Sequence, residues 1–217
     1  ERDSLEKTLN SDKELKKLLA KEMQAEVKQY GDPRRSPLVA REQAQAFDEK
    51  VLVSSDPITV ILSAKGWVRA AKGYDVDPTS LNYRAGDSFA AAGQGRSNQQ
   101  AVFLDASGRS YSVPAHTLPS ARGQGEPLSG RFTPPDGIGF LYVLLGEPES
   151  QYLLASDAGY GFMVNLNDLY SKNKAGKAIL TLPEDAKVLP PVQIRPDTDH
   201  YLVITNAGYL SMVSLTE

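Results

Sequence analysis

Residues 101–110 read AVFLDASGRS, an apolar run followed by a short polar turn that ends in glycine. The pattern recurs as TVILSAKGWV at residues 59–68, YLLASDAGYG at residues 152–161 and YLVITNAGYL at residues 201–210. In each copy the glycine falls where a tight hairpin turn needs a positive φ angle, which glycine adopts without strain. These glycines are residues 66, 108, 159 and 208, so the repeat spacings are 42, 51 and 49 residues. Such spacings are typical of four-stranded, propeller-type blades, and the repeats predict a mainly β domain.

The extent of this β domain follows from the repeats. From Val51 onward, Pro and Gly become frequent and alternate with short runs of Val, Ile, Leu and Tyr. We predict that residues 51–217 hold about three blades and the start of a fourth. The fourth copy begins only about sixteen residues before Glu217. The last blade is therefore expected to be incomplete here, or completed by a neighbouring strand.

The first thirty residues contain no Gly or Pro and are rich in Leu, Lys, Glu and Ala, which predicts helix. An apolar stripe at helical spacing runs through Leu15, Leu19, Met23 and Val27, and Leu5 and Leu9 precede it. We expect the stripe to pack on another helix. The alternative is an independent helix that binds a partner protein.

The boundaries of the helical segment are marked by local signals. Ser11 and Glu14 match a capping box, so a short helix to about residue 9 should be followed by a new helix from about residue 12 to residue 30. Gly31 and Pro33 are expected to end that helix. Residues 31–50 are predicted to be a linker.

The distribution of charge limits where a polyanion could bind. The chain has 24 basic and 27 acidic residues, a formal net charge of −3, which is not the basic footprint usual in nucleic-acid binding. Residues 1–50 are balanced, residues 51–135 carry eight basic and six acidic side chains, and residues 136–217 carry five basic and ten acidic ones. Any polyanion site is therefore expected on the first half of the β domain.

Cysteine is absent, which excludes disulfides and thiolate metal sites and is compatible with a reducing cytoplasm. No apolar run approaches the ~18 residues of a membrane-spanning helix. The N-terminus is too highly charged for a signal peptide. Because the sequence starts at Glu1 without a methionine, we expect it to be an excised fragment.

No catalytic constellation is found in the sequence. His116 and His200 are far apart and have no neighbours at metal-ligand spacing, so we interpret them as exposed loop residues. The glycine-rich residues 122–126 lack the Lys-Ser/Thr ending of a phosphate-binding loop. The chain by itself is predicted to be no enzyme and to hold no metal or cofactor.

Basic loops that contain glycine recur after the hairpins, and we predict that they occupy a similar place in each blade. They are Tyr83-Arg84-Ala85-Gly86, Ala121-Arg122-Gly123-Gln124-Gly125 and Lys174-Ala175-Gly176-Lys177. Glycines let a duplex approach the main chain, and the basic side chains can reach phosphate oxygens. The alternative is a set of turns between blades with solvated basic residues. Trp67 is expected to lie in a blade core or between blades rather than to stack on a base.

Several strings resemble the A subunits of bacterial type IIA topoisomerases. YGDPRRSPL at residues 30–38 is similar to the junction where the coiled coil of gyrase and topoisomerase IV A subunits ends. KGWVR at residues 65–69, LNYRAGDS at 81–88, LPSARGQGEPL at 118–128 and ASDAGYGF at 155–162 are similar to the C-terminal domain of the topoisomerase IV A subunits (ParC). The resemblance covers essentially the whole chain.

The resemblance implies a β-pinwheel, a propeller-like ring of hairpin blades that exchange strands, preceded by the α-helical end of a coiled coil. It implies a non-catalytic domain that binds and bends duplex DNA and guides the transported segment for decatenation and supercoil relaxation. The parent would be an ATP-dependent type II topoisomerase, cytoplasmic and associated with the nucleoid. Its cleavage tyrosine would lie outside this chain, and ATP and Mg²⁺ would belong to the B subunit of topoisomerase IV. That B subunit and a second A subunit are the implied partners, and a chromosome-condensation protein is a further candidate.

One departure separates the sequence from gyrase A subunits, which carry a Gln-Arg-Arg-Gly-Gly-Lys-Gly box in the first blade and wrap DNA strongly. The nearest strings here, RGQG at residues 122–125 and KAGK at residues 174–177, match that box in part. The departure favours topoisomerase IV over the alternative of a gyrase-type wrapping domain.

The predicted phosphate contacts are the basic residues of the early blades and of the third basic loop. They are Lys65, Arg69, Lys72, Arg84, Arg96, Arg109, Arg122 and Arg131, with Lys172, Lys174 and Lys177 in addition. Each is expected to contact phosphate rather than to read bases. A competing hypothesis is a propeller that binds proteins, with the acidic residues 136–217 facing a basic partner.

Overall fold

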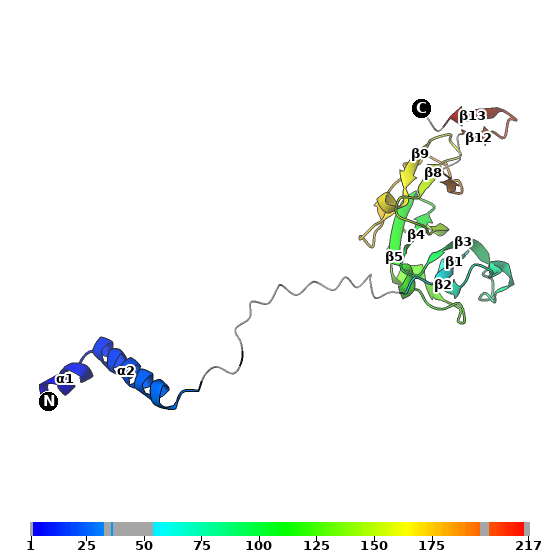
Figure 1. Cartoon of the computed structure of the whole chain (residues 1–217). Coiled ribbons are helices and arrows are strands. Elements are labelled where there is room, and N and C mark those ends of the chain that lie inside the picture. Colours follow the sequence, from blue (N-terminus) through cyan, green and yellow to red (C-terminus); the bar gives the residue numbers. More distant parts are fainter. Residues whose placement is uncertain (1, 33–35, 37–53, 196–199, 215–217) are drawn as a thin grey trace. The chain divides into compact units, whose positions relative to one another are not determined.

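A computed structural model describes residues 2–32, 36, 54–195 and 200–214 of the chain (Figure 1). The contacts divide the chain into two compact units, Glu1–Ala46 and Phe47–Glu217. The linker predicted for residues 31–50 lies almost wholly outside the described residues, as do Pro33 and most of residues 30–38. Each unit is therefore considered by itself.

The first unit contains two helices, α1 (Arg2–Leu9) and α2 (Asp12–Tyr30), with the predicted break between them. Ser11 occupies the N-cap of α2, but its side chain makes no capping hydrogen bond, so the predicted capping box is wrong. The first turn is instead closed by its main chain, with the Leu15 N–H donating to the Ser11 carbonyl at 2.9 Å. The apolar stripe is exposed, and no described residue of this unit covers it. Neither helix is long and apolar enough to cross a membrane.

The second unit is built from antiparallel hairpins, which confirms the mainly β prediction. The hairpins are β1 (Pro57–Ser63) with β2 (Trp67–Lys72), β4 (Gln100–Asp105) with β5 (Arg109–Pro114), β8 (Gln151–Ala155) with β9 (Gly161–Asn165), and β12 (His200–Ile204) with β13 (Leu210–Ser214). The four quoted repeats are these four hairpins. We number the blades one to four in this order.

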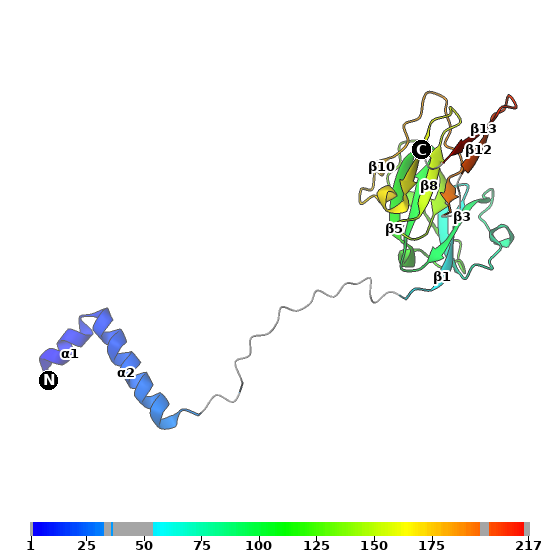
Figure 2. The same cartoon turned by 45° about the horizontal axis from the view of Figure 1, so that its top comes forward.

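Each of the first three hairpins gains a strand from the residues that follow it. These strands are β3 (Phe89–Arg96) on β1, β7 (Phe140–Leu144) on β4, and β11 (Val192–Ile194) on β8. In each of the first two blades, the second strand of the hairpin also pairs with a short strand that follows the next hairpin in the sequence. These partners are β6 (Glu126–Pro127) on β2 and β10 (Lys177–Ala178) on β5. Neighbouring blades therefore exchange strands, and Figure 2 shows β10 beside β5.

The turn of each hairpin repeats one hydrogen bond. The glycine N–H donates to the carbonyl three residues earlier, at 2.9 Å from Gly66 to Ser63 and 3.2 Å from Gly108 to Asp105. The third and fourth hairpins repeat this bond at 3.1 Å and 2.9 Å. All four glycines have φ between 77° and 83°, which confirms the left-handed conformation that the repeats predict.

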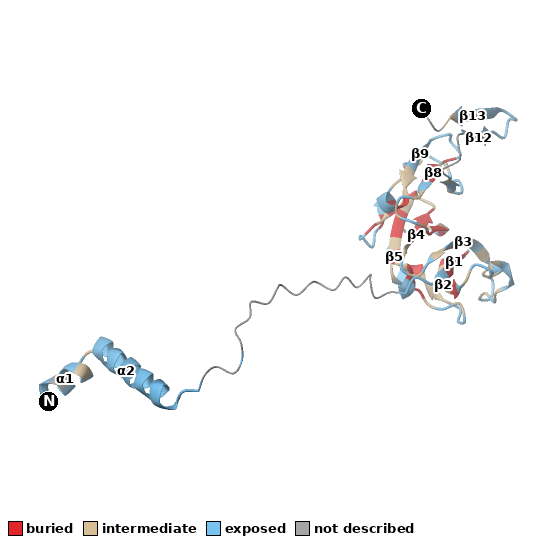
Figure 3. Cartoon of the chain, in the orientation of Figure 1, coloured by how far each residue is buried: buried red, intermediate tan, exposed pale blue. Residues whose placement is uncertain are grey.

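The core lies between neighbouring blades because β4 is buried on both faces (Figure 3). Successive side chains of a strand point to opposite faces. Ala101 and Phe103 therefore pack with the first blade, whereas Val102 and Leu104 pack with the third. Fully burying a Val, Leu or Phe side chain stabilises a fold by about 1.5–3 kcal/mol. The continuous apolar run of residues 101–104 thus holds three blades together.

A buried polar pair reinforces the turn of the second blade. Asp105 is 0% exposed, and its carboxylate accepts hydrogen bonds from the Ser107 and Arg109 N–H groups, both at 2.9 Å. The Tyr111 hydroxyl donates to the second carboxylate oxygen at 2.8 Å. Burial raises the pKa of this hydroxyl, and the bond to Asp105 raises it further, so Tyr111 stays a neutral donor.

Short 3₁₀ turns connect the strands. They are η1 (Pro78–Ser80), η2 (Ala115–Thr117), η3 (Leu128–Gly130) and η4 (Leu166–Leu169). The last two carry fully buried leucines, Leu128 on η3 and Leu166 and Leu169 on η4. These turns therefore anchor the connections between blades to the core.

We expect Gly125→Ala to destabilise the β unit, because Gly125 has φ +84° and a Cβ there would collide with the Val68 carbonyl oxygen. The expected loss is about 1–3 kcal/mol of unfolding free energy, measured by urea denaturation. Gly123→Ala is the matched control in the same loop, since its Cβ would come no closer than 3.9 Å to Ser120. Equal stability of the two variants would contradict the close packing of this loop on β2.

Replacing Tyr111 by Phe should leave Asp105 with a buried oxygen that lacks its donor. We expect a loss of about 1–3 kcal/mol in unfolding free energy, because an unsatisfied buried acceptor keeps its desolvation penalty. Thermal and urea unfolding would measure it. The control is Tyr160→Phe, whose side chain is 66% exposed and whose hydroxyl loss should change stability little.

Candidate nucleic-acid interface

A cluster of cations gathers at the hairpin end of the first blade. Lys65 lies in the β1–β2 turn, and its Nζ donates to the Ala85 carbonyl at 3.4 Å. The Arg84 guanidinium carbon lies 3.6 Å from the centre of the Trp67 ring, and both Lys65 and Arg84 are exposed. The loop at residues 81–88 is thus held against the turn by a cation–π contact and a hydrogen bond.

Trp67 is half-buried and pairs with Pro127 of the exchanged strand. It therefore lies at the junction between blades, in agreement with its interpretation from the sequence. The Arg84 guanidinium stacks on one face of the Trp67 ring, and this contact fixes the position of the Arg84 charge. No sequence pattern indicated this pairing of the two side chains.

The loop at residues 119–125 lies beside β2, and the residues that follow it pair with β2 as strand β6. Ala70 donates its N–H to the Pro119 carbonyl, and its carbonyl accepts the N–H of Ala121, both at 2.8 Å. Arg122, next in the chain, is exposed, and its side chain makes no hydrogen bond or ion pair with another described residue. The main-chain pairing therefore places the main chain of a further cation beside the middle of β2.

Arg69 lies beneath these loops and is only 5% exposed. Its Nη1 donates to the Asn82 carbonyl at 3.0 Å and to the Gly123 carbonyl at 3.2 Å. Its guanidinium carbon also lies 4.7 Å from the centre of the Tyr83 ring. Because Arg69 is buried, its side chain cannot touch a polyanion directly, and the surface position predicted for it from the sequence is wrong.

The sequence did not single out Asp87, which lies within the same cluster. Its carboxylate accepts hydrogen bonds from the Lys65 and Ser88 N–H groups, both at 2.9 Å. Burial alone would raise the pKa of Asp87, but the hydrogen bonds from Ser63, Lys65 and Ser88 lower it below the ordinary value. Asp87 is therefore ionised at neutral pH and fixes the turn that carries Lys65.

A second cluster of cations lies at the equivalent end of the second blade. Arg109 starts β5, and its Nη1 donates to the Ala175 carbonyl at 3.1 Å. Lys177, on β10, pairs with Ser110, and its Nζ donates to the Asp168 carbonyl at 2.7 Å. Lys172 and Lys174 precede β10 and are exposed, and their side chains make no hydrogen bond or ion pair among the described residues.

The register of the exchanged strands corrects one prediction from the sequence. Val68 pairs with Glu126 and Ser110 pairs with Lys177, so the loop at residues 121–125 corresponds to the one at residues 172–176. The loop at residues 83–86 lies elsewhere in its blade. At the end of this loop the Asp87 N–H donates a hydrogen bond to the Arg84 carbonyl. The same turn bond recurs from Ile138 to Pro135 and from Ala186 to Pro183, so the counterparts of the loop are residues 134–137 and 182–185. Those counterparts are acidic or apolar, so the described blades do not carry three equivalent basic loops.

The remaining predicted contacts lie away from these clusters or are engaged. Lys72 and Arg96 pair with Ile58 and Pro57, at the other end of the first blade. That end is about 13 Å along β2 from Val68, at about 3.3 Å per residue, and about half as far from Ala70, where the Arg122 loop pairs. Arg131 forms an ion pair with Glu126 and donates two hydrogen bonds to Thr117, so its charge is compensated.

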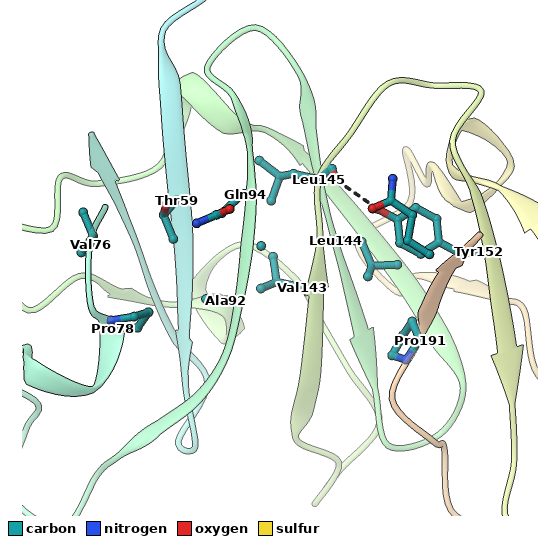
Figure 4. A pocket seen from close by; sticks show the side chains of 12 residues that line it. Thr59, Val76, Pro78, Ala92, Gln94, Val143, Leu144, Leu145, Tyr152 and Pro191 are labelled. Atoms are coloured by element: carbon teal, nitrogen blue, oxygen red, sulfur yellow. Dashed lines mark hydrogen bonds between the residues drawn. The ribbon is translucent and has the colours of Figure 1, made fainter. Parts of the chain in front are cut away.

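Two clefts lie away from the cations. One, of about 390 Å³, is lined by inner strands of the blades, including Gln94 of β3 and Val143 of β7, and Figure 4 shows the Tyr152 hydroxyl bonded to Leu145 beside it. The other, of about 560 Å³, is lined by Glu147 and Glu149 among others. Neither cleft is lined mainly by basic side chains, so neither suits a polyanion. Among the described residues, no group of acidic and histidine side chains could hold a metal ion.

No protein-family model matches the chain. The A subunit of DNA topoisomerase 4 from Escherichia coli K12 is 51% identical over 217 residues, all of this chain and 29% of that protein. The same protein of Pseudomonas aeruginosa is 52% identical over 218 residues, again 100% of this chain and 29% of the relative. This chain thus spans less than a third of the length of these relatives.

Among solved structures, the Escherichia coli ParC C-terminal domain superposes on this chain with a TM-score of 0.70 and 53% sequence identity. The match covers 74% of this chain and 66% of that domain. The fold is therefore a β-pinwheel, as the resemblance implied. Sequence identity along the whole chain and a shared fold lead to one conclusion: the chain belongs to the family of DNA topoisomerase 4 A subunits, to the part that carries their C-terminal β-pinwheel.

Proposed function

We propose that the β unit binds duplex DNA through the two cation clusters of the first and second blades. The observation that carries the proposal is that the loops bearing Lys65, Arg84 and Arg122, which are distant in sequence, contact one another or a shared side chain beside β2. Arg109 and Lys174 belong to a second group of cations at the next blade, although not at positions equivalent to the first. Successive clusters on neighbouring blades suit a duplex that follows the blades.

These side chains are suited to contact phosphates of the duplex rather than to read its bases. They stand on hairpin turns and loops, and the described β unit offers no α-helix that could enter a groove. Neutralising phosphates with Lys and Arg releases counterions, so the affinity should fall steeply with salt. With about 4–6 contacts, the slope of log affinity against log salt is expected to be about −4 to −5.

Charge beyond the second blade argues for a guided or bent duplex rather than full wrapping. At the positions equivalent to Arg84 and Ala85, the second blade carries Pro135-Asp136 and the third carries Pro183-Glu184. Residues 178–217, which follow the lysines of the second cluster, carry five acidic and two basic side chains. A duplex that meets the first two blades would therefore be repelled from the third.

In the longer protein, we propose that this domain guides the transported DNA segment for decatenation and supercoil relaxation. The chain would contribute binding and bending, while strand cleavage and ATP hydrolysis with Mg²⁺ would belong to other parts of a cytoplasmic complex. That complex would contain a second A subunit and the B subunit of topoisomerase IV. The support is the family relationship together with the lack of any catalytic constellation in the sequence.

The test is binding of the 217-residue chain to a fluorescent duplex of about 40 base pairs across a salt series. We expect the variant Arg84→Ala/Arg122→Ala to bind about tenfold or more weakly, because each charged hydrogen bond contributes appreciably. Its salt slope should become shallower by about 2, since two phosphate contacts are lost. All duplex sequences should be affected alike.

The matched control is Lys187→Ala/Arg195→Ala, which removes the same charge from exposed residues of the third blade. It should bind nearly as the unchanged chain does. Equal loss in both variants would mean that net charge alone matters and would refute the localised interface. A flat salt dependence, or no binding at low salt, would favour the alternative of a protein-interaction propeller.

A further inference from the structure

Arg69 is a buried cation without a compensating carboxylate among the described residues. It is 5% exposed, and it forms no ion pair with a described acidic residue. Its Nη2 is buried and has no hydrogen-bond partner in the described part of the chain. Burying an uncompensated charge is costly, and an apolar side chain of similar volume would often be more stable in such a place. Stability alone therefore does not explain the presence of arginine here.

The contacts of Arg69 join two loops that are 41 residues apart in sequence. One Nη1 atom donates to the Asn82 carbonyl, two residues before Arg84, and to the Gly123 carbonyl, directly after Arg122. The Tyr83 ring, on the first of these loops, covers the guanidinium at 4.7 Å. Arg69 thus touches the main chain beside both exposed arginines of the first-blade cluster.

A lysine could not reproduce this arrangement. The guanidinium is planar, presents several N–H groups in a fixed fork and stacks on an aromatic ring, whereas an ammonium is a flexible point charge. A guanidinium can therefore fix the separation of the two loops as well as adding positive potential beneath them.

We propose that Arg69 is the positioning residue of the first-blade cluster. It clamps the loop at residues 82–86 to the loop at residues 121–125, so that Arg84 and Arg122 meet the same duplex at a fixed spacing. Arg69 itself does not touch the DNA. This inference rests on the proposed DNA-binding function and assigns the preorganisation of its site to one side chain.

The experiment is a double-mutant cycle on duplex affinity with the whole 217-residue chain. Its members are the unchanged chain, Arg69→Lys, Arg84→Ala/Arg122→Ala, and the combination of all three substitutions. Arg69→Lys keeps the positive charge but loses the planar set of guanidinium N–H donors. We expect this substitution to weaken duplex binding about tenfold. In the background that lacks Arg84 and Arg122 the same substitution should have almost no further effect, because the two arginines that Arg69 positions are gone.

Trp67 supplies a direct readout of the first loop, whereas the coupling in the double-mutant cycle is what a purely structural role would not produce. It is the one tryptophan and lies 3.6 Å from Arg84, so loosening of the first loop should change its emission and raise its quenching by acrylamide. Arg96→Lys is the matched control, since Arg96 is exposed and bonded to Ser55 at the other end of the blade. It should change neither the affinity nor the tryptophan signal. Tyr83→Leu, which removes the ring but keeps every charge, should weaken binding in the same way if Arg69→Lys fails to fold.

The outcomes separate the two proposals. Salt-dependent binding by the unchanged chain, with a loss at Arg69→Lys that vanishes in the Arg84→Ala/Arg122→Ala background, supports the clamp. Binding by the unchanged chain with fully additive losses, or with no loss at Arg69→Lys, overturns the clamp and leaves the DNA-binding proposal intact. Failure of the unchanged chain to bind a duplex at low salt overturns both.

Discussion

The return of residues 119–128 to the open edge of β2 is the constraint on which the first blade and its cation cluster depend. Hydrogen bonds from Ala70, Ala121 and Leu128 hold this segment in place, and Gly125 allows its main chain to touch Val68. Without that pairing, β2 would be an edge strand with unsatisfied main-chain groups. The pairing also sets Gly123 where Arg69 can reach it, so one segment completes a sheet, links two blades and carries Arg122 to the site.

Strand exchange also explains how a thin blade acquires a core. A hairpin alone is marginally stable in water. Here β4 is covered on both faces, because the first blade packs against Ala101 and Phe103 and the third against Val102 and Leu104. The buried Asp105 and Tyr111 pair then fixes the turn that begins β5. The main chain of Arg109 is therefore held by a turn that buried hydrogen bonds fix.

Charge and burial act in opposite directions beneath the proposed interface. The exposed cations cost the fold little because water solvates them, whereas Arg69 is desolvated and has one buried nitrogen without a partner among the described residues. Asp87 offsets part of the positive charge while it holds the Lys65 turn. The clusters are thus organised by main-chain carbonyls and an aromatic ring more than by ion pairs, which leaves positive charge available at the surface.

The sequence by itself determined the hairpins, their glycine turns, the break between the two helices and the family, because these depend on local conformational preference and on continuous strings of residues. It also identified the half of the β domain with an excess of basic residues. Only the tertiary structure decided which loops are equivalent, that Arg69 is buried, that Arg131 is paired with Glu126 and that Arg84 lies on Trp67. These outcomes depend on the register of strands exchanged between blades, and a register is set by long-range pairing that leaves no periodic signal in the sequence.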